Sequence, residues 1–182
     1  MKKLLLTILF CFMAVLSHGQ TKHLTIMGIP ITGSITTFQQ KLLAKNYRLD
    51  TKENKSLPVG QRAFKGKFSG HECSLIAYYF PESKTVHKVK VSIGFLKAID
   101  AVNSYNEIKK NLLVKYSNAK PKTGRKDGSE FMRMYVEDDA DMPLGIIDLF
   151  VDEGERDFES ELVIGYKDVD SLKEDFKNMN DL

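Results

Sequence analysis

Three things are scarce in this sequence of 182 residues: it has no tryptophan, only two cysteines, and no apolar run as long as a membrane-spanning helix needs. Without tryptophan the chain lacks a side chain that stacks well on a sugar ring, which disfavours a glycosidase. Cys11 lies in an apolar N-terminal stretch, and Cys73 stands alone in the remainder. If that stretch is removed, no intramolecular disulfide can form, and packing alone must hold the fold.

The N-terminal stretch has the pattern of a secretory signal peptide. Lys2 and Lys3 precede an uncharged apolar segment, residues 4–16, and the small residues Ser17 and Gly19 fit the positions that a signal peptidase reads. We therefore expect residues 1–19 to be cleaved and residues 20–182 to form an exported, periplasmic or secreted protein. A buried N-terminal helix or a membrane anchor is the alternative. Lipidation at Cys11 is not expected, because the bulky Phe10 precedes it.

Helical and strand-like segments follow one another in an order typical of an α+β domain. Ser34 precedes apolar residues at helical spacing, and Ser104 with Glu107 forms a capping box. A third cap at Ser171 predicts a C-terminal helix at about 169–179. Strands are predicted at 23–31, 63–68, 73–80, 85–95, 131–136, 145–151 and 161–166, and loops at 60, 81–84, 121–128 and 139–143. We expect one domain, residues 20–182, with an antiparallel sheet and helices on one face.

An internal repeat emerges when the chain is shifted by 70 residues. Ser34 then falls on Ser104 and Leu42 on Leu112, and each of these helices is followed by three strand-like runs. This order predicts a tandem duplication of a helix-plus-three-strands unit, with copies at about 34–95 and 104–166. A chance similarity of two amphipathic helices is the alternative.

Two resemblances accompany these patterns. Residues 29–35, IPITGSI, directly after the signal peptide, and residues 64–70, FKGKFSG, are similar to a family of uncharacterised small secreted proteins of Bacteroidetes bacteria. The doubled order of elements resembles the architecture of β-lactamase inhibitor proteins, whose concave sheet grips a protein partner. The second resemblance concerns topology alone and implies a binding role for the sheet without transferring any residue.

Charge is distributed unevenly along the chain. Residues 21–128 contain 20 basic and 7 acidic side chains, whereas residues 129–182 contain 5 basic and 17 acidic side chains. Export and a near-neutral mature chain disfavour a nucleic-acid partner. Self-association of a basic half with an acidic half is one hypothesis that this asymmetry raises.

Alternation along the predicted strands places a set of charged side chains on the open face of the sheet, opposite the helices. The acids Asp148 and Glu161 of the second half are expected there too. The consecutive aromatics of residues 78–80 must point to both faces, so that one of them can serve as an anchor. The predicted binding residues are Lys65, Lys67, Lys88, Lys90 and Tyr78, and an acidic protein surface or a polyanionic glycan is the expected partner. A merely solvated face is the alternative.

No motif predicts catalysis, a metal site or a cofactor. His71 and Cys73 share a strand face, but His87, the next imidazole, is expected about 20 Å from Cys73 at about 3.3 Å per strand residue. The acidic run at 137–141 lacks the spacing and the glycine of an EF-hand calcium loop. We therefore expect a non-catalytic exported binding domain. The alternative is an enzyme or enzyme inhibitor of unrecognised type.

Overall fold

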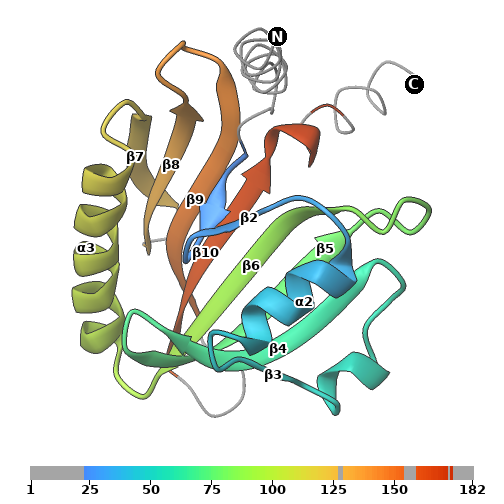
Figure 1. Cartoon of the computed structure of the whole chain (residues 1–182). Helices are drawn as coiled ribbons and strands as arrows, with labels where there is room; N and C mark the ends of the chain where they lie inside the picture. The colour runs from blue at the N-terminus through green and yellow to red at the C-terminus, as the bar shows by residue number, and fades with distance from the viewer. Residues whose placement is uncertain (1–22, 127–128, 154–158, 172, 174–182) are drawn as a thin grey trace, which may run out of the picture.

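An eight-stranded antiparallel sheet forms the centre of the molecule (Figure 1). The computed structural model describes residues 23–126, 129–153, 159–171 and 173, so the predicted signal peptide, residues 1–19, lies outside the described residues. The sheet order is β3-β4-β5-β6-β10-β9-β8-β7. The strands are β3 (Arg48–Leu49), β4 (Gln61–Phe68), β5 (His71–Tyr79), β6 (Val86–Phe95), β7 (Lys120–Lys126), β8 (Ser129–Glu137), β9 (Pro143–Glu153) and β10 (Ser160–Asp168).

Helices cover one face of this sheet and leave the other open. α2 (Ile35–Leu43) lies over β4 to β6, and α3 (Ala98–Lys115) lies over the half that contains β8 to β10 (Figure 1). Between the two helices runs a small hairpin of β1 (Thr25–Ile26) and β2 (Ile29–Pro30). A short 3₁₀ turn, η1 (Glu53–Lys55), follows β3. The predicted fold class, α+β with an antiparallel sheet and helices on one face, is confirmed. Among the described residues, no helix combines the length and the apolar character needed to cross a membrane.

The order of elements repeats, but each unit has four strands instead of the predicted three. α2 is followed by β3 to β6 and α3 by β7 to β10, and the two four-stranded groups meet at β6 and β10. The predicted loop at 121–128 is wrong, because residues 120–126 form the edge strand β7. This strand was not predicted because it contains Pro121, Gly124 and several cations, which are typical of a loop. Proline and lysine are nevertheless tolerated at a sheet edge. Duplication as the origin of this order stays a prediction.

Of the predicted helix N-caps, Ser34 is confirmed by the structure, and Ser104 is wrong. At α2 the Ser34 cap is confirmed, because its hydroxyl accepts the Thr37 N–H at 3.1 Å. α3 begins at Ala98 and not at Ser104, which is buried inside the helix with its Oγ 3.4 Å from His71 Nε2. The capping-box pattern at Ser104 was therefore misleading: its serine packs against the sheet. Residues 169–171 and 173 are helical, and the rest of the predicted C-terminal helix lies outside the described residues.

The core lies between the sheet and the layer of helices and hairpin. Along β6 the residues Val89, Val91 and Ile93 are buried, and the residues between them face the other side. On β10 the same face carries Leu162 and Ile164, as the register with β6 requires. Alternation of apolar and polar residues on the strands therefore decides which face the helices cover.

Tyr47 fastens the segment after α2 to the edge of the sheet. Its ring lies on Gly66, where a Cβ atom would come within 2.5 Å of the ring. Its hydroxyl donates to the carbonyl oxygen of Lys67 at 2.9 Å and lies 3.5 Å from Cys73 Sγ. Burial raises the pKa of Tyr47, so the phenol stays protonated and remains a donor. The lone cysteine is thus a buried thiol beside this contact.

We predict that Tyr47→Phe lowers the free energy of unfolding by about 1 kcal/mol, because it leaves the Lys67 carbonyl without its donor. Tyr79→Phe is the matched control, since the Tyr79 hydroxyl makes no hydrogen bond to a described residue. Urea unfolding followed by circular dichroism measures both variants. Equal stability of the two variants would contradict this role of Tyr47.

Candidate binding face of the sheet

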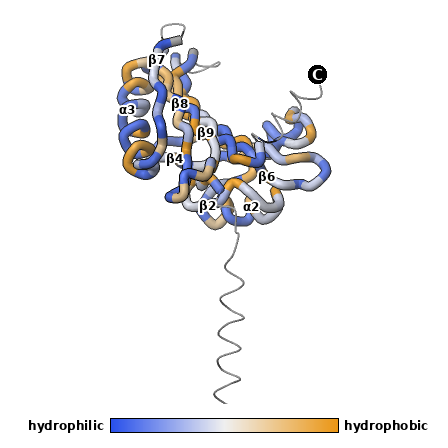
Figure 2. Tube along the Cα trace, turned by 90° about the horizontal axis from the view of Figure 1, so that it is seen from above, coloured by the Kyte–Doolittle hydropathy of each residue, from blue (hydrophilic) through white to orange (hydrophobic). Residues whose placement is uncertain are grey.

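The five predicted binding residues lie together on the open face. Strand register makes Tyr78 and Lys88 direct partners on β5 and β6, and it pairs Lys90 with Ile76. Lys65 and Lys67 on β4 pair with Ser74 and Glu72, which alternate with the buried residues of β5. Figure 2 shows that the sheet curves around this face, with α2 and α3 on the outside of the bend. The prediction that these side chains share one face is therefore confirmed, whereas their binding role stays a prediction.

Two of the predicted lysines already have acidic partners. Lys65 Nζ lies 2.9 Å from Asp50 Oδ2, and Lys67 Nζ lies 3.4 Å from Glu72 Oε1. The Lys65 ammonium, together with backbone N–H groups, holds the pKa of Asp50 below its usual range. These ion pairs sit at the β4 edge and are partly exposed to solvent, so their net contribution to stability is small. The β4 lysines are consequently a weaker part of the face than the sequence predicted.

The lysines of β6 have different surroundings. Lys88 Nζ lies 4.5 Å from the centroid of the Tyr78 ring, a cation–π geometry, and burial raises the pKa of Tyr78. Lys90 is half-buried, stands between Ile76 and Gly165, and makes no hydrogen bond or ion pair to any residue in the described part of the chain. Partial burial leaves the Lys90 ammonium with less water around it than a surface lysine has, and no described residue supplies a counter-charge. Lys90 is therefore the cation on this face that has most to gain from an incoming anion.

Sequence reasoning missed the other half of the face. Lys167 on β10 lies directly opposite Lys88, so basic side chains occupy neighbouring positions on the two central strands. Farther along two of these rows the open face is apolar, with Val163, Phe150 and Phe131 in one row and Ile146 and Tyr135 in the other; the row between them, which contains Lys90, carries the ion pair of Asp148 and Arg133. The signal was present in the alternation of β8 and β9, where these residues stand between core positions such as Met132 and Leu149. The face thus combines a basic patch with an aromatic and aliphatic stripe.

The sequence has a basic first part and an acidic second part, but the sheet does not have a basic half and an acidic half. The basic strand β7 lies at the edge farthest from β3 and β4, so the acidic segment of β8 to β10 is flanked by basic strands. Asp148 is also neutralised locally, since Arg133 donates to both of its oxygens at 2.6 and 3.0 Å. Lys120 on β7 similarly pairs with Glu137 at 2.8 Å. The sheet therefore does not have one basic half and one acidic half, which is the arrangement that the self-association hypothesis assumes.

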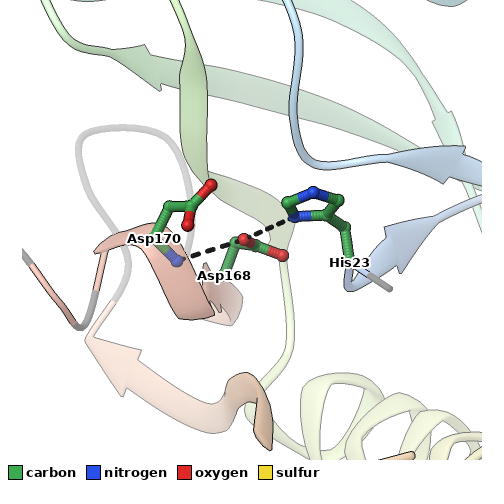
Figure 3. A group of neighbouring side chains, drawn as sticks. All are labelled: His23, Asp168 and Asp170. Carbon is green, nitrogen blue, oxygen red and sulfur yellow. Dashed lines mark hydrogen bonds and ion pairs between the residues drawn. The ribbon is translucent and has the colours of Figure 1, made fainter. Parts of the chain in front are cut away.

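A buried carboxylate joins the N-terminal segment to the end of β10 (Figure 3). Asp168 is fully buried; its Oδ1 lies 2.9 Å from His23 Nδ1, and its Oδ2 accepts the Leu24 N–H at 2.9 Å. The Asp170 N–H also donates to Oδ1, at 3.2 Å. Burial raises the pKa of Asp168, while these hydrogen bonds oppose the rise. No local sequence pattern indicates this contact, because His23 and Asp168 are 145 residues apart; we call these hydrogen bonds of Asp168 the Asp168 latch.

His23, Asp168 and Asp170 also form a group of metal-ligating side chains, with ligand atoms within 4.8 Å of one another. A divalent cation would have to displace the donors that already occupy both Asp168 oxygens, and Lys173 Nζ pairs with Asp170 at 3.1 Å. The hydrogen bonds thus account for the geometry of the latch without a cation. His71, Cys73 and His87, which the sequence analysis considered, are not part of this group.

We predict that Asp168→Ala lowers the free energy of unfolding by about 1–3 kcal/mol, because the buried Leu24 N–H loses its acceptor. Asp170→Ala is the matched control: it removes only a partly exposed pair with Lys173 and should cost less than about 1 kcal/mol. Thermal unfolding with and without EDTA measures both effects. Equal losses in the two variants would contradict the latch, and a fall in the wild-type midpoint with EDTA would assign the group to a bound cation.

Comparison with protein-family models, curated proteins and solved structures finds no match to this chain. The two resemblances stated from the sequence therefore stay predictions, and the candidate site rests on the geometry of this chain alone.

Proposed function

We propose that this chain is an exported, non-catalytic binding domain that captures an acidic protein surface on the concave open face of its sheet. The observation that carries the proposal is Lys90, half-buried on that face without an anionic partner among the described residues. Lys88 and Tyr78 stand beside it on the same face. Binding an acidic group next to Lys90 would supply the counter-charge that the fold omits.

The composition of the face favours a protein partner over a polyanionic glycan. A glycan-binding surface needs accessible cations along its whole length, whereas here Phe150 and Tyr135 stand between the basic strands β6 and β7, and Arg133 in the middle is already paired with Asp148. Aromatic side chains beside basic ones are typical of the energetic centre of a protein interface. Charges at the rim would then steer association and weaken with salt.

The curvature of the sheet supports the same conclusion. Small or absent side chains line the middle of the open face, since Ser92 and Ser74 are direct partners and Gly165 stands opposite Lys90. The open face is concave (Figure 2), so a convex loop or helix of a partner protein could approach the backbone there. Such an arrangement buries the central lysine and aromatic groups together, as a tight interface requires.

We predict that the double variant Lys88→Glu/Lys90→Glu weakens capture of its envelope partner at least about tenfold at physiological salt, a change of about 1.4 kcal/mol or more. The matched control, Lys41→Glu/Lys110→Glu, makes the same charge change at exposed positions on the two helices. Immobilised mature chain is exposed to an envelope extract, and the retained proteins are identified by mass spectrometry at low and high salt.

The proposal requires that wild type and control retain the same acidic protein and that the β6 variant loses it. Retention that is unchanged by the β6 variant would contradict a role for the open face. Salt-dependent retention on a heparin column that only the β6 variant loses, without capture of any protein, would assign the face to a polyanionic glycan instead.

A further inference from the structure

A pocket of about 370 Å³ opens on the opposite side of the sheet, next to α3. Its helical wall is formed by Ile108 and Leu112, one turn apart on α3, and its other walls include Met27 and Phe68. Volumes of about 300–1,000 Å³ are usual for small-molecule sites, and this one is too small for a helix or a strand of another protein. The apolar walls therefore suit the body of a small ligand.

The pocket wall that faces α3 is formed by two tight turns. The β1–β2 turn has positive φ at Met27 (50°) and Gly28 (76°), and the β4–β5 turn has it at Ser69 (48°) and Gly70 (84°). Paired positive φ angles are typical of the two-residue turns that match the twist of a hairpin. Methionine is a costly residue in this conformation, by about 1–2 kcal/mol. Its side chain nevertheless forms part of the pocket wall and lies 3.4 Å from the Tyr47 hydroxyl.

A polar group without a partner reaches this pocket. Tyr166 on β10 lines the pocket and is only 2% exposed, yet its hydroxyl makes no hydrogen bond to any described residue. Every fully enclosed side-chain nitrogen or oxygen in the described residues has a partner, so this hydroxyl keeps a small exposure, and the residue that carries it lines the pocket. Burial raises the pKa of Tyr166, which keeps the group protonated and able to donate.

A cation, Lys115, also lines the pocket. Lys115, one turn after Leu112, donates to the carbonyl oxygen and the hydroxyl of Thr25 at 3.0 and 3.1 Å. It makes no ion pair with a carboxylate in the described segments, and its ammonium lies 4.6 Å from the centroid of the Tyr116 ring, a cation–π contact. Tyr116, the phenol that interacts electrostatically with Tyr166, donates to the same Thr25 carbonyl at 2.8 Å. Lys115 and Tyr166 thus line the same pocket, and both Lys115 and Tyr116 are held by Thr25.

From this arrangement we propose that the α3 pocket binds a small amphiphilic carboxylate. The ligand's carboxylate pairs with the Lys115 ammonium, which has no carboxylate partner among the described residues, and accepts a hydrogen bond from the Tyr166 hydroxyl. Its aliphatic body lies between Leu112, Ile108 and the side chains of the two turns. The site is independent of the open face, because the sheet separates the α3 pocket from Lys90.

The test uses decanoate as the ligand and decanol as an uncharged analogue with the same aliphatic body. Isothermal titration of the mature protein should show one decanoate site, with decanol bound at least tenfold more weakly. Lys115→Gln should weaken decanoate at least tenfold and leave decanol unchanged, and Tyr166→Phe should weaken decanoate while the ring keeps its shape. Lys110→Gln, an exposed position on the same helix outside the pocket, is the matched control.

Folding of each variant is checked by its thermal midpoint, and Tyr166→Phe should keep the wild-type value because its hydroxyl has no hydrogen-bond partner among the described residues. Lys88→Glu/Lys90→Glu should bind decanoate normally, which separates this site from the open face. Failure of the wild type to bind decanoate, or equal affinity for decanoate and decanol that Lys115→Gln does not change, would overturn the proposal.

Discussion

Eight residue pairs join β6 to β10, from Phe95 opposite Ser160 to Lys88 opposite Lys167, and this antiparallel seam is what makes one sheet out of two units. Each unit alone would be a four-stranded meander with an uncovered edge, which is prone to aberrant pairing. Pairing the two edges satisfies their backbone groups in the middle of the molecule. It also fixes the register, so that Val91 and Ile164 face the helices together.

Because side chains alternate along strands, this seam also determines what each face carries. The residues between the core positions of β6 and β10 include Lys88, Lys90 and Lys167 at one end and Ser92 and Val163 farther along, so the open face of this seam is basic at one end. On the other face the same strands present Tyr166 to the space between α3 and the β1–β2 hairpin. The two proposed sites are therefore opposite sides of the same pair of strands.

Much of this could be predicted from local patterns, and the rest depends on contacts that no local pattern encodes. The alternation in β6 predicted that strand, and the cap at Ser34 predicted the start of α2, because each pattern acts over a few neighbouring residues. β7 was missed because edge strands tolerate proline and charge, and the start of α3 because Ser104 serves a tertiary contact with His71. The Asp168 latch and the α3 pocket join segments distant in sequence, so only the folded chain reveals them.

The fold and both proposed sites require that the two units fold as one cooperative sheet through the pairing of β6 and β10. Amide hydrogen exchange measured residue by residue tests this most directly, since exchange reports the free energy of local opening. We expect the amides of Val91 and Ile164 to be among the slowest in the molecule and to exchange with the same opening free energy. If the opening free energy of β10 were lower than that of β6 by several kcal/mol, with the first unit still protected, the two units would not form one cooperative sheet.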